Sequence, residues 1–188
     1  MRLFIGIDPG EDVRERLERV LVHLRACAHL KWSPVYNLHM TLKFIGEWPE
    51  DKLPQLEAAL RSISPREPIV ADVKGLGWYP NPNHPRVFWV GVQAGDTLAA
   101  LVQDIEAAMA PLGFAKEARP FNAHLTLARI KEPAPLQALR DAIAQLESVE
   151  YGSLLVDRFC LYRSQPGSAG SIYTKLSEYP LQARVKAK

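Results

Sequence analysis

The chain has 188 residues, of which 47% are hydrophobic and 23% are charged, and this composition excludes an intrinsically disordered chain. Its net charge of +2 permits an anionic ligand but does not predict a surface coated with nucleic acid. Two cysteines, Cys27 and Cys160, are too few for a disulfide framework and lack the spacing of a zinc or redox motif. No apolar run suits a signal peptide or a membrane span, so we expect a cytoplasmic protein without a membrane partner.

The first half of the chain has the pattern of alternating strands and helices. Asp8, with Pro9 and Glu11 after it, predicts a capping box at the start of the first helix. The expected elements are a strand over residues 3–7, a helix over 13–24, a strand with its approach over 31–45, a helix over 53–63 and a strand over 69–76. Residues 78–85 contain three prolines and are expected to form a stiff loop.

The second half repeats this order of elements. We expect strands over residues 86–92, 119–130, 154–162 and 171–176, and helices over residues 98–112 and 136–146. Asp96 or Thr97 would cap the first of these helices, and Gly113 stands where a C-terminal cap belongs. The Gly/Ser-rich residues 164–170 predict a loop, and the basic tail from Ala183 is expected to fray.

This repetition predicts one α+β domain made of two like lobes. The sequence halves are roughly 1–85 and 86–182, and no break in composition separates them within residues 1–188. We expect the lobes to pack about a pseudo-twofold axis, with helices outside and sheets lining a central groove. An internally paired protein of this kind is expected to be a monomer.

The central feature of the sequence is a His-x-Thr-x motif that occurs twice. His39 and Thr41 form the first copy, and His124 and Thr126 form the second, 85 residues later. Side chains alternate between the faces of a strand, so each pair shares one face while the leucines and methionine between them share the other. One such motif is most simply a half-buried histidine beside a β-forming residue. Two copies in equivalent elements predict a catalytic pair.

Two imidazoles suit acid–base chemistry on a phosphodiester. One neutral histidine takes a proton from water while the other, protonated, gives one to the leaving oxygen. The threonine hydroxyls would donate hydrogen bonds to the phosphate oxygens. The sequence has no metal-ligand motif, nucleotide-binding glycine loop or serine-hydrolase elbow, so we expect neither a metal nor another cofactor.

The doubled motif resembles the signature of the 2H phosphoesterase superfamily. Across essentially the whole chain, the sequence resembles the RNA 2′,3′-cyclic phosphodiesterase (2′-5′ RNA ligase) branch of this superfamily. The segments that carry this resemblance are Arg2-Leu3-Phe4-Ile5, Leu38 to Gly46, Arg119-Pro120-Phe121, His124 to Arg129 and Tyr162-Arg163-Ser164. The resemblance implies a bilobal fold of antiparallel sheet and metal-independent hydrolysis of RNA 2′,3′-cyclic phosphate ends, on tRNA fragments or cyclic nucleotides, to 2′-phosphates. It also implies reversible 2′-5′ RNA ligation through the same proton chemistry.

The resemblance also implies roles for single residues. His39 would be the proton donor and His124 the acceptor, although the nearly symmetric motifs do not assign these roles themselves. Phe44 and Arg129, each five residues after its histidine, would hold a base between them. Strict alternation places both on the buried face, so a bulge or a strand end must turn them. Ala123 stands where the family usually has proline, which removes no chemical group.

Weaker candidates surround the motifs. Lys43 shares the alternation face of His39, and either contacts the phosphate or is a solvated lysine at the strand end. Arg119 is expected to contact phosphate or backbone. Trp78, Tyr79 and His84 are expected to belong to an ordinary packed loop in preference to an RNA contact.

Two other functions remain open from the sequence. The chain could bind RNA ends with little turnover, although binding alone does not need both histidines. The same machinery could also act on another small cyclic phosphate, such as a metabolite or a nucleotide-sugar derivative.

Overall fold

The computed structural model describes residues 1–168 and 170–182, so the expected fraying of the tail from Ala183 lies outside the described residues. The strands are β1 (Arg2–Ile7), β2 (Lys31–Trp32), β3 (Met40–Glu47), β4 (Ile69–Tyr79), β5 (Val87–Gln93), β6 (His124–Arg129), β7 (Glu150–Val156), β8 (Arg158–Gly167) and β9 (Gly170–Pro180). The α-helices are α1 (Glu11–Cys27), α2 (Leu53–Arg61), α3 (Gly95–Met109) and α4 (Gln137–Ala144), and short 3-10 helices span Val35–Asn37, Glu50–Lys52 and Ala110–Leu112.

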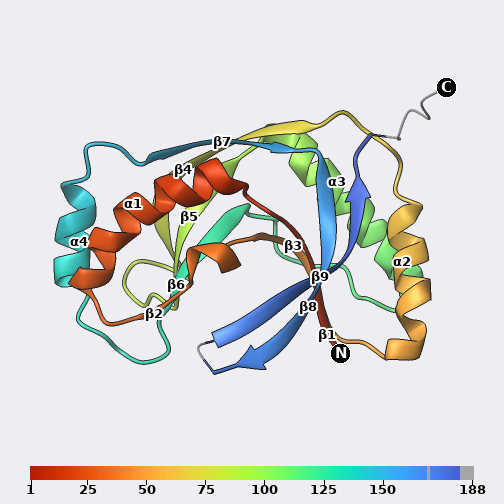
Figure 1. Ribbon diagram of the computed structural model, residues 1–188, viewed down its shortest axis with the longest axis horizontal. Coiled ribbons are helices and arrows are strands. Elements are labelled where there is room, and N and C mark those ends of the chain that lie inside the picture. The colour runs from red at the N-terminus through yellow and green to blue at the C-terminus, as the bar shows by residue number, and fades with distance from the viewer. Residues whose placement is uncertain (169, 183–188) are drawn as a thin grey trace.

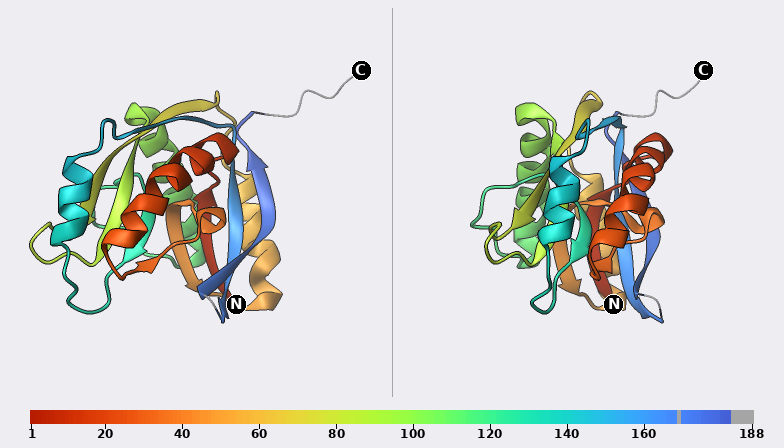
Figure 2. Two further views of the ribbon diagram at one scale, coloured as in Figure 1. Left: turned by 60° about the vertical axis from the view of Figure 1, so that its left-hand side comes forward. Right: turned by 90° about the vertical axis from the view of Figure 1, so that its left-hand side faces the viewer.

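Within these residues the strands form a curled antiparallel sheet in the order β7-β4-β5-β6-β3-β1-β8-β9, with β2 added beside β6 (Figure 1). The two halves of this sheet meet where β3 pairs with β6 through Met40 and Leu125. Figure 2 shows α1 and α3 on opposite sides of the molecule with the strands between them. The protein therefore has the expected α+β architecture of two like lobes with helices outside.

Strands of each sequence half cross to the other lobe. By place in the sheet, β3, β1 and β8 on one side of the centre correspond to β6, β5 and β4 on the other. In this arrangement β4 of the first half pairs with β5, and β8 of the second half pairs with β1. Each lobe therefore combines strands from both sequence halves, and the lobes are not the sequence halves folded separately.

One large apolar cluster supports both lobes. It joins the buried face of α1, including Leu17 and Leu21, to sheet residues such as Ile5 and Leu125, each of them no more than 1% exposed. A second, small cluster of Phe4, Cys160 and Tyr162 is separate from it. Since Phe4 and Ile5 are neighbours in β1, the two clusters lie on opposite faces of the sheet, and the smaller one marks the inner face.

The structure corrects several expected boundaries. Residues 154–162 are divided between β7 and β8, and the expected second motif strand begins only at His124. Tyr79 belongs to β4, where it pairs with Val87, and not to the proline-rich loop. The Gly/Ser-rich segment pairs as far as Gly167 with Gly170, so cross-strand hydrogen bonds make a hairpin of the expected loop.

The helix caps also differ from expectation. Asp8 accepts a hydrogen bond from the Gly10 N–H at 2.8 Å and pairs with Arg14, so it does not form a capping box with Glu11. No side chain caps α3, which begins after Ala94. Gly113 does end the following 3-10 turn with φ 89°, a left-handed conformation that favours glycine, as predicted.

Candidate active site

The two motifs lie side by side at the centre of the sheet. The Met40–Leu125 pair, extended by one residue each way, places His39 beside Thr126 and Thr41 beside His124. The intervening apolar residues are at most 5% exposed, as alternation predicted: Leu38, Met40, Leu42, Leu125 and Leu127. The inner face of the sheet therefore receives two imidazoles and two hydroxyls, one set from each sequence half.

Both imidazoles are held by a hydrogen bond to the backbone carbonyl two residues earlier in the chain. The His39 Nδ1 lies 2.7 Å from the Asn37 carbonyl oxygen, and the His124 Nδ1 lies 2.8 Å from the Asn122 carbonyl oxygen. A carbonyl only accepts hydrogen bonds, so each Nδ1 must carry a proton and donate it. The neutral tautomer therefore leaves Nε2 with a free lone pair, and the protonated ring leaves an Nε2–H to donate. Either ring can act as an acid or as a base.

The surroundings lower the pKa of both histidines. Burial is the main cause of the lowered pKa of His39, and the positive charges of Arg129 and His124 add to it. The carbonyl hydrogen bond and the Asp8 carboxylate act on the pKa of His39 in the opposite direction. Burial and then Arg129 lower the pKa of His124 against its own carbonyl hydrogen bond. The two rings and the guanidinium thus share one electrostatic environment.

Aromatic side chains pack around His39. Its ring lies 4.6 Å from that of Phe4 and meets Tyr173 edge to face at 4.8 Å. A hollow of about 200 Å³ adjoins the His39 ring, and Asp8 and Lys175 are among the residues that line it. The aromatic contacts fix the ring plane and remove part of its hydration.

A different aromatic pair packs around His124. Tyr79 meets the ring edge to face at 5.2 Å, and Trp89 lies 6.3 Å from it. The Trp89 indole lies over Gly77, where an added Cβ would come within 2.2 Å of the indole, so only glycine permits this packing. The Tyr79 hydroxyl and the Trp89 Nε1 are buried and have no hydrogen-bond partner among the described residues. Sequence reasoning placed neither residue in the site, because contacts across strands cannot be read from local pattern.

Two β-bulges turn Phe44 and Arg129 onto the inner face. Gly6 pairs with Thr41 and Phe4 with Phe44, while Leu42 is skipped, so Phe44 lies on the face of Thr41. The second strand does the same at Leu127: Trp89 pairs with Thr126 and Val87 with Arg129. Phe44 is 68% exposed, so a ligand can reach its ring. The expected requirement for a bulge is therefore met at the equivalent leucine of each motif.

The same bulge takes Lys43 away from the site. Lys43 pairs across the strands with the core residue Ile5, and its Nζ lies 2.7 and 2.8 Å from the carboxylate oxygens of Glu106 on α3. Its side chain is 7% exposed. Both alternatives for Lys43, the phosphate contact and the solvated lysine, are therefore wrong, because the extra residue at Leu42 reverses the alternation on which they depended.

Arg119 lies outside the motif strands. It is exposed in the segment before β6, where its backbone N–H donates to Glu117 at 3.2 Å. Its guanidinium forms no hydrogen bond or ion pair with another described residue, so its predicted role stays a prediction.

Fold and site together define a class of α+β protein in which a duplicated His-x-Thr motif supplies one imidazole from each sequence half. Within this class, the chain belongs to the LigT-like phosphoesterase family, whose model matches residues 7–89 and 90–173. The RNA 2′,3′-cyclic phosphodiesterase of Methanothermobacter thermautotrophicus is 34% identical over 96% of this chain and 99% of its own length.

Solved structures agree with this membership. TT0787 of Thermus thermophilus superposes with a TM-score of 0.81 at 31% identity, covering 98% of this chain and 100% of its own. Escherichia coli LigT complexed with 3′-AMP gives a TM-score of 0.71 at 26% identity, covering 97% of this chain and 98% of its own.

Two kinds of feature are absent from the described residues. No group of three His, Cys, Asp or Glu side chains is arranged there to hold a metal ion. None of the helices in residues 1–168 and 170–182 combines the length and apolar character that a bilayer crossing requires.

Proposed function

We propose that this chain hydrolyses RNA 2′,3′-cyclic phosphate ends to 2′-phosphates by acid–base catalysis with two histidines. The observation that carries the proposal is the pair of imidazoles on one face, each with Nδ1 committed to a backbone carbonyl and Nε2 left for substrate. The curated relatives named RNA 2′,3′-cyclic phosphodiesterase support the choice of substrate.

In the proposed reaction, the neutral Nε2 of His124 takes a proton from water as the water oxygen attacks phosphorus. The bond from phosphorus to the 3′ oxygen breaks, and the protonated Nε2 of His39 gives its proton to that oxygen. The Asp8 carboxylate favours the protonated form of His39, as a proton donor requires. Each transfer contributes typically about 10²- to 10⁴-fold to the rate.

The remaining residues of the inner face would bind the substrate. The hydroxyls of Thr41 and Thr126 form no hydrogen bond with another described side chain, which leaves them to donate to the phosphate oxygens. The Arg129 guanidinium, close to both imidazoles, also favours a bound anion. Phe44 and Arg129 would hold the terminal base between them by stacking, which tolerates any base.

The same chemistry extends to ligation. An RNA 5′-hydroxyl in place of water would leave a 2′-5′ phosphodiester, and tRNA fragments with cyclic ends are suitable substrates for both reactions. Since the two imidazoles supply both proton transfers, no metal has to activate the nucleophile. We therefore expect full turnover of a cyclic-phosphate substrate by a monomer in EDTA.

The decisive experiment measures turnover of uridine 2′,3′-cyclic phosphate by single variants. His39→Ala and His124→Ala should each lower kcat by about 10³-fold or more, because each removes one proton transfer and the geometry it fixes. His23→Ala, at an exposed position on α1, is the matched control and should retain wild-type turnover. Near wild-type turnover by either active-site variant would rule out the mechanism.

Product analysis tests the substrate assignment. A defined RNA with a cyclic end should yield only the 2′-phosphate, since the bond to the 3′ oxygen breaks. Tight binding without turnover would instead favour an RNA-end binding module. Faster turnover of a non-nucleotide cyclic phosphate would favour the same chemistry on a small metabolite.

A further inference from the structure

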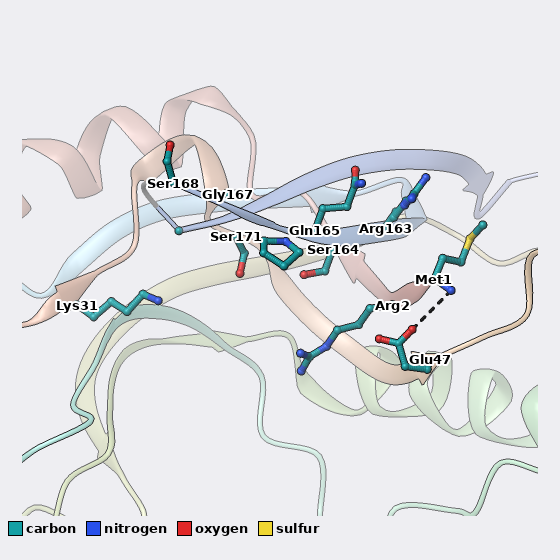
Figure 3. A pocket seen from close by; sticks show the side chains of 12 residues that line it. Met1, Arg2, Lys31, Glu47, Arg163, Ser164, Gln165, Gly167, Ser168 and Ser171 are labelled. Carbon is teal, nitrogen blue, oxygen red and sulfur yellow. Dashed lines mark ion pairs between the residues drawn. The ribbon is translucent and has the colours of Figure 1, made fainter.

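A second and larger hollow opens on the same inner face, beyond Phe44 and Arg129. Its volume is about 700 Å³, within the range of about 300–1,000 Å³ that is typical of ligand pockets. It is bounded by the start of β1, by Lys31 of β2 and by the tip of the β8–β9 hairpin, with Ser164 and Ser171 among the lining residues (Figure 3). Neither histidine contributes to its lining, so it is distinct from the site of the proposed reaction.

Strand pairing makes this hollow continuous with the proposed base site. Arg2 lies two residues before Phe4, which pairs with Phe44, so Arg2 and Phe44 share the inner face. On the other side, Lys31 pairs directly with Arg129 and shares its face. Each residue expected to hold the terminal base therefore has a basic residue near it on the inner face: Arg2 lies farther from the histidines than Phe44, and Lys31 lies level with Arg129.

Of the three basic residues that line the hollow, Arg2, Lys31 and Arg163, the first two converge on it. Figure 3 shows the Arg2 guanidinium and the Lys31 ammonium turned toward one another from opposite walls. Neither forms an ion pair with a described residue. The one carboxylate of the lining, that of Glu47, lies 3.5 Å from the N-terminal ammonium of Met1. The hollow thus has an unbalanced positive charge, together with serine hydroxyls that can donate hydrogen bonds.

We propose that Arg2 and Lys31 bind the phosphate on the 5′ side of the terminal nucleotide, so that this hollow selects RNA chains over isolated cyclic nucleosides. The proposal rests on the proposed function, because it takes the cyclic phosphate to lie at the histidines and the base beside Phe44. A cyclic nucleoside has no group for the larger hollow. An RNA chain supplies an anion there at every step.

The test compares three substrates: uridine 2′,3′-cyclic phosphate, its 5′-phosphorylated form, and a dinucleotide with the same cyclic end. Wild-type kcat/KM should rise by about 10-fold or more when the 5′-phosphate is added, since a hydrogen bond to a charged group is worth that much. Arg2→Ala and Lys31→Ala should each remove most of this gain through KM, with kcat unchanged. Both variants should hydrolyse the unphosphorylated cyclic nucleoside within about twofold of wild type.

Arg19→Ala provides the matched control, since Arg19 is a 77% exposed basic residue of α1. It should retain the full gain. For the dinucleotide, the slope of log kcat/KM against log salt concentration should become shallower by about 0.7 for each basic residue removed from the hollow, and not for Arg19→Ala.

Failure of the subsite and failure of the reaction give different results. Equal kcat/KM with and without the 5′-phosphate, or equal losses on all three substrates in Arg2→Ala and Lys31→Ala, would overturn the subsite while leaving hydrolysis intact. If no substrate turned over, calorimetric binding of uridine 2′-phosphate and uridine 2′,5′-bisphosphate would still test it. About 10-fold tighter binding of the bisphosphate, lost in both variants, supports the proposal, and equal binding refutes it.

Discussion

Replacing Lys43 by methionine should destabilise the protein and leave its chemistry intact. The Lys43 ammonium contacts both carboxylate oxygens of Glu106 and lies 3.3 Å from the Ala115 carbonyl. The two side chains are 7% and 8% exposed, so water cannot take the place of either partner. Lys43→Met therefore leaves a buried carboxylate without a counter-charge.

The expected cost follows from this burial. Removing one partner of a buried ion pair costs about 3–5 kcal/mol, against a total free energy of unfolding of about 5–15 kcal/mol for a typical protein. At about 2–4 °C per kcal/mol for a chain of this length, Tm should fall by roughly 6–20 °C. Replacing both partners, as in Lys43→Met with Glu106→Leu, should recover most of the loss, because apolar side chains of similar volume can replace a buried pair.

Two measurements at 25 °C, urea unfolding and turnover of uridine 2′,3′-cyclic phosphate, distinguish a stabilising role of Lys43 from a contact with the phosphate. Lys52→Met, at an exposed position, should remain within about 0.5 kcal/mol of wild type. Per folded molecule, Lys43→Met should keep kcat/KM near the wild-type value. Unchanged stability together with a loss of kcat/KM of about 10-fold or more would place Lys43 at the phosphate and refute this reasoning.

The remaining predictions concern pH and the base site. Because burial lowers the pKa of both His39 and His124, the optimum of kcat/KM should lie below pH 6.5, and a bound phosphate anion should move the kcat profile to higher pH. An optimum of kcat/KM above pH 7.5 would contradict the lowered pKa values. In the unfolded chain, His39 and His124 take up protons at higher pH than in the folded protein, so the free energy of unfolding should fall as pH drops below 6.5. Urea titrations at pH 7.5 and 5.5 measure this dependence, and His39→Gln should weaken it. Phe44→Ala should raise KM by about 5- to 150-fold through lost stacking, with no change in the urea midpoint. The control Val22→Ala, at an exposed position on α1, should change neither quantity. An unaltered KM in Phe44→Ala would exclude Phe44 from the base site.

The sequence predicted the faces of the motifs because alternation is a local property. His39, Thr41 and the leucines around them lie as a regular strand requires, and so do their counterparts in β6. The bulges could be anticipated only as a condition for Phe44 and Arg129 to reach the site. Leu42 and Leu127 suit a regular strand equally well, so nothing in their chemistry indicates an unpaired residue.

Pairing with distant strands decided the features that the sequence missed. The Gly/Ser-rich segment has the composition of a loop, yet its partner in β9 extends it as a strand. Tyr79 is a second example: its pairing with Val87 and its ring contact with Trp89 at 5.1 Å extend β4 up to the residue before Pro80. The basic hollow likewise depends on Lys31 and Arg2, which are 29 positions apart in the sequence and meet only through the sheet.

The exchange of β4 and β8 between the lobes also could not be predicted from the sequence repeat. Two similar halves have the same local sequence whether each pairs with itself or with the other, and only the register of β4 on β5 and of β8 on β1 distinguishes the cases.

That crossing bears on how such a chain can be divided or can have arisen. A polypeptide cut near residue 85 would yield two fragments, each lacking an interior strand of its own sheet, so neither should be stable without the other, and mixing them should restore a single molecule. A protein made of one such half would meet the same requirement by exchanging a strand with a second copy of itself, and joining two copies in one chain keeps that exchange within a single molecule.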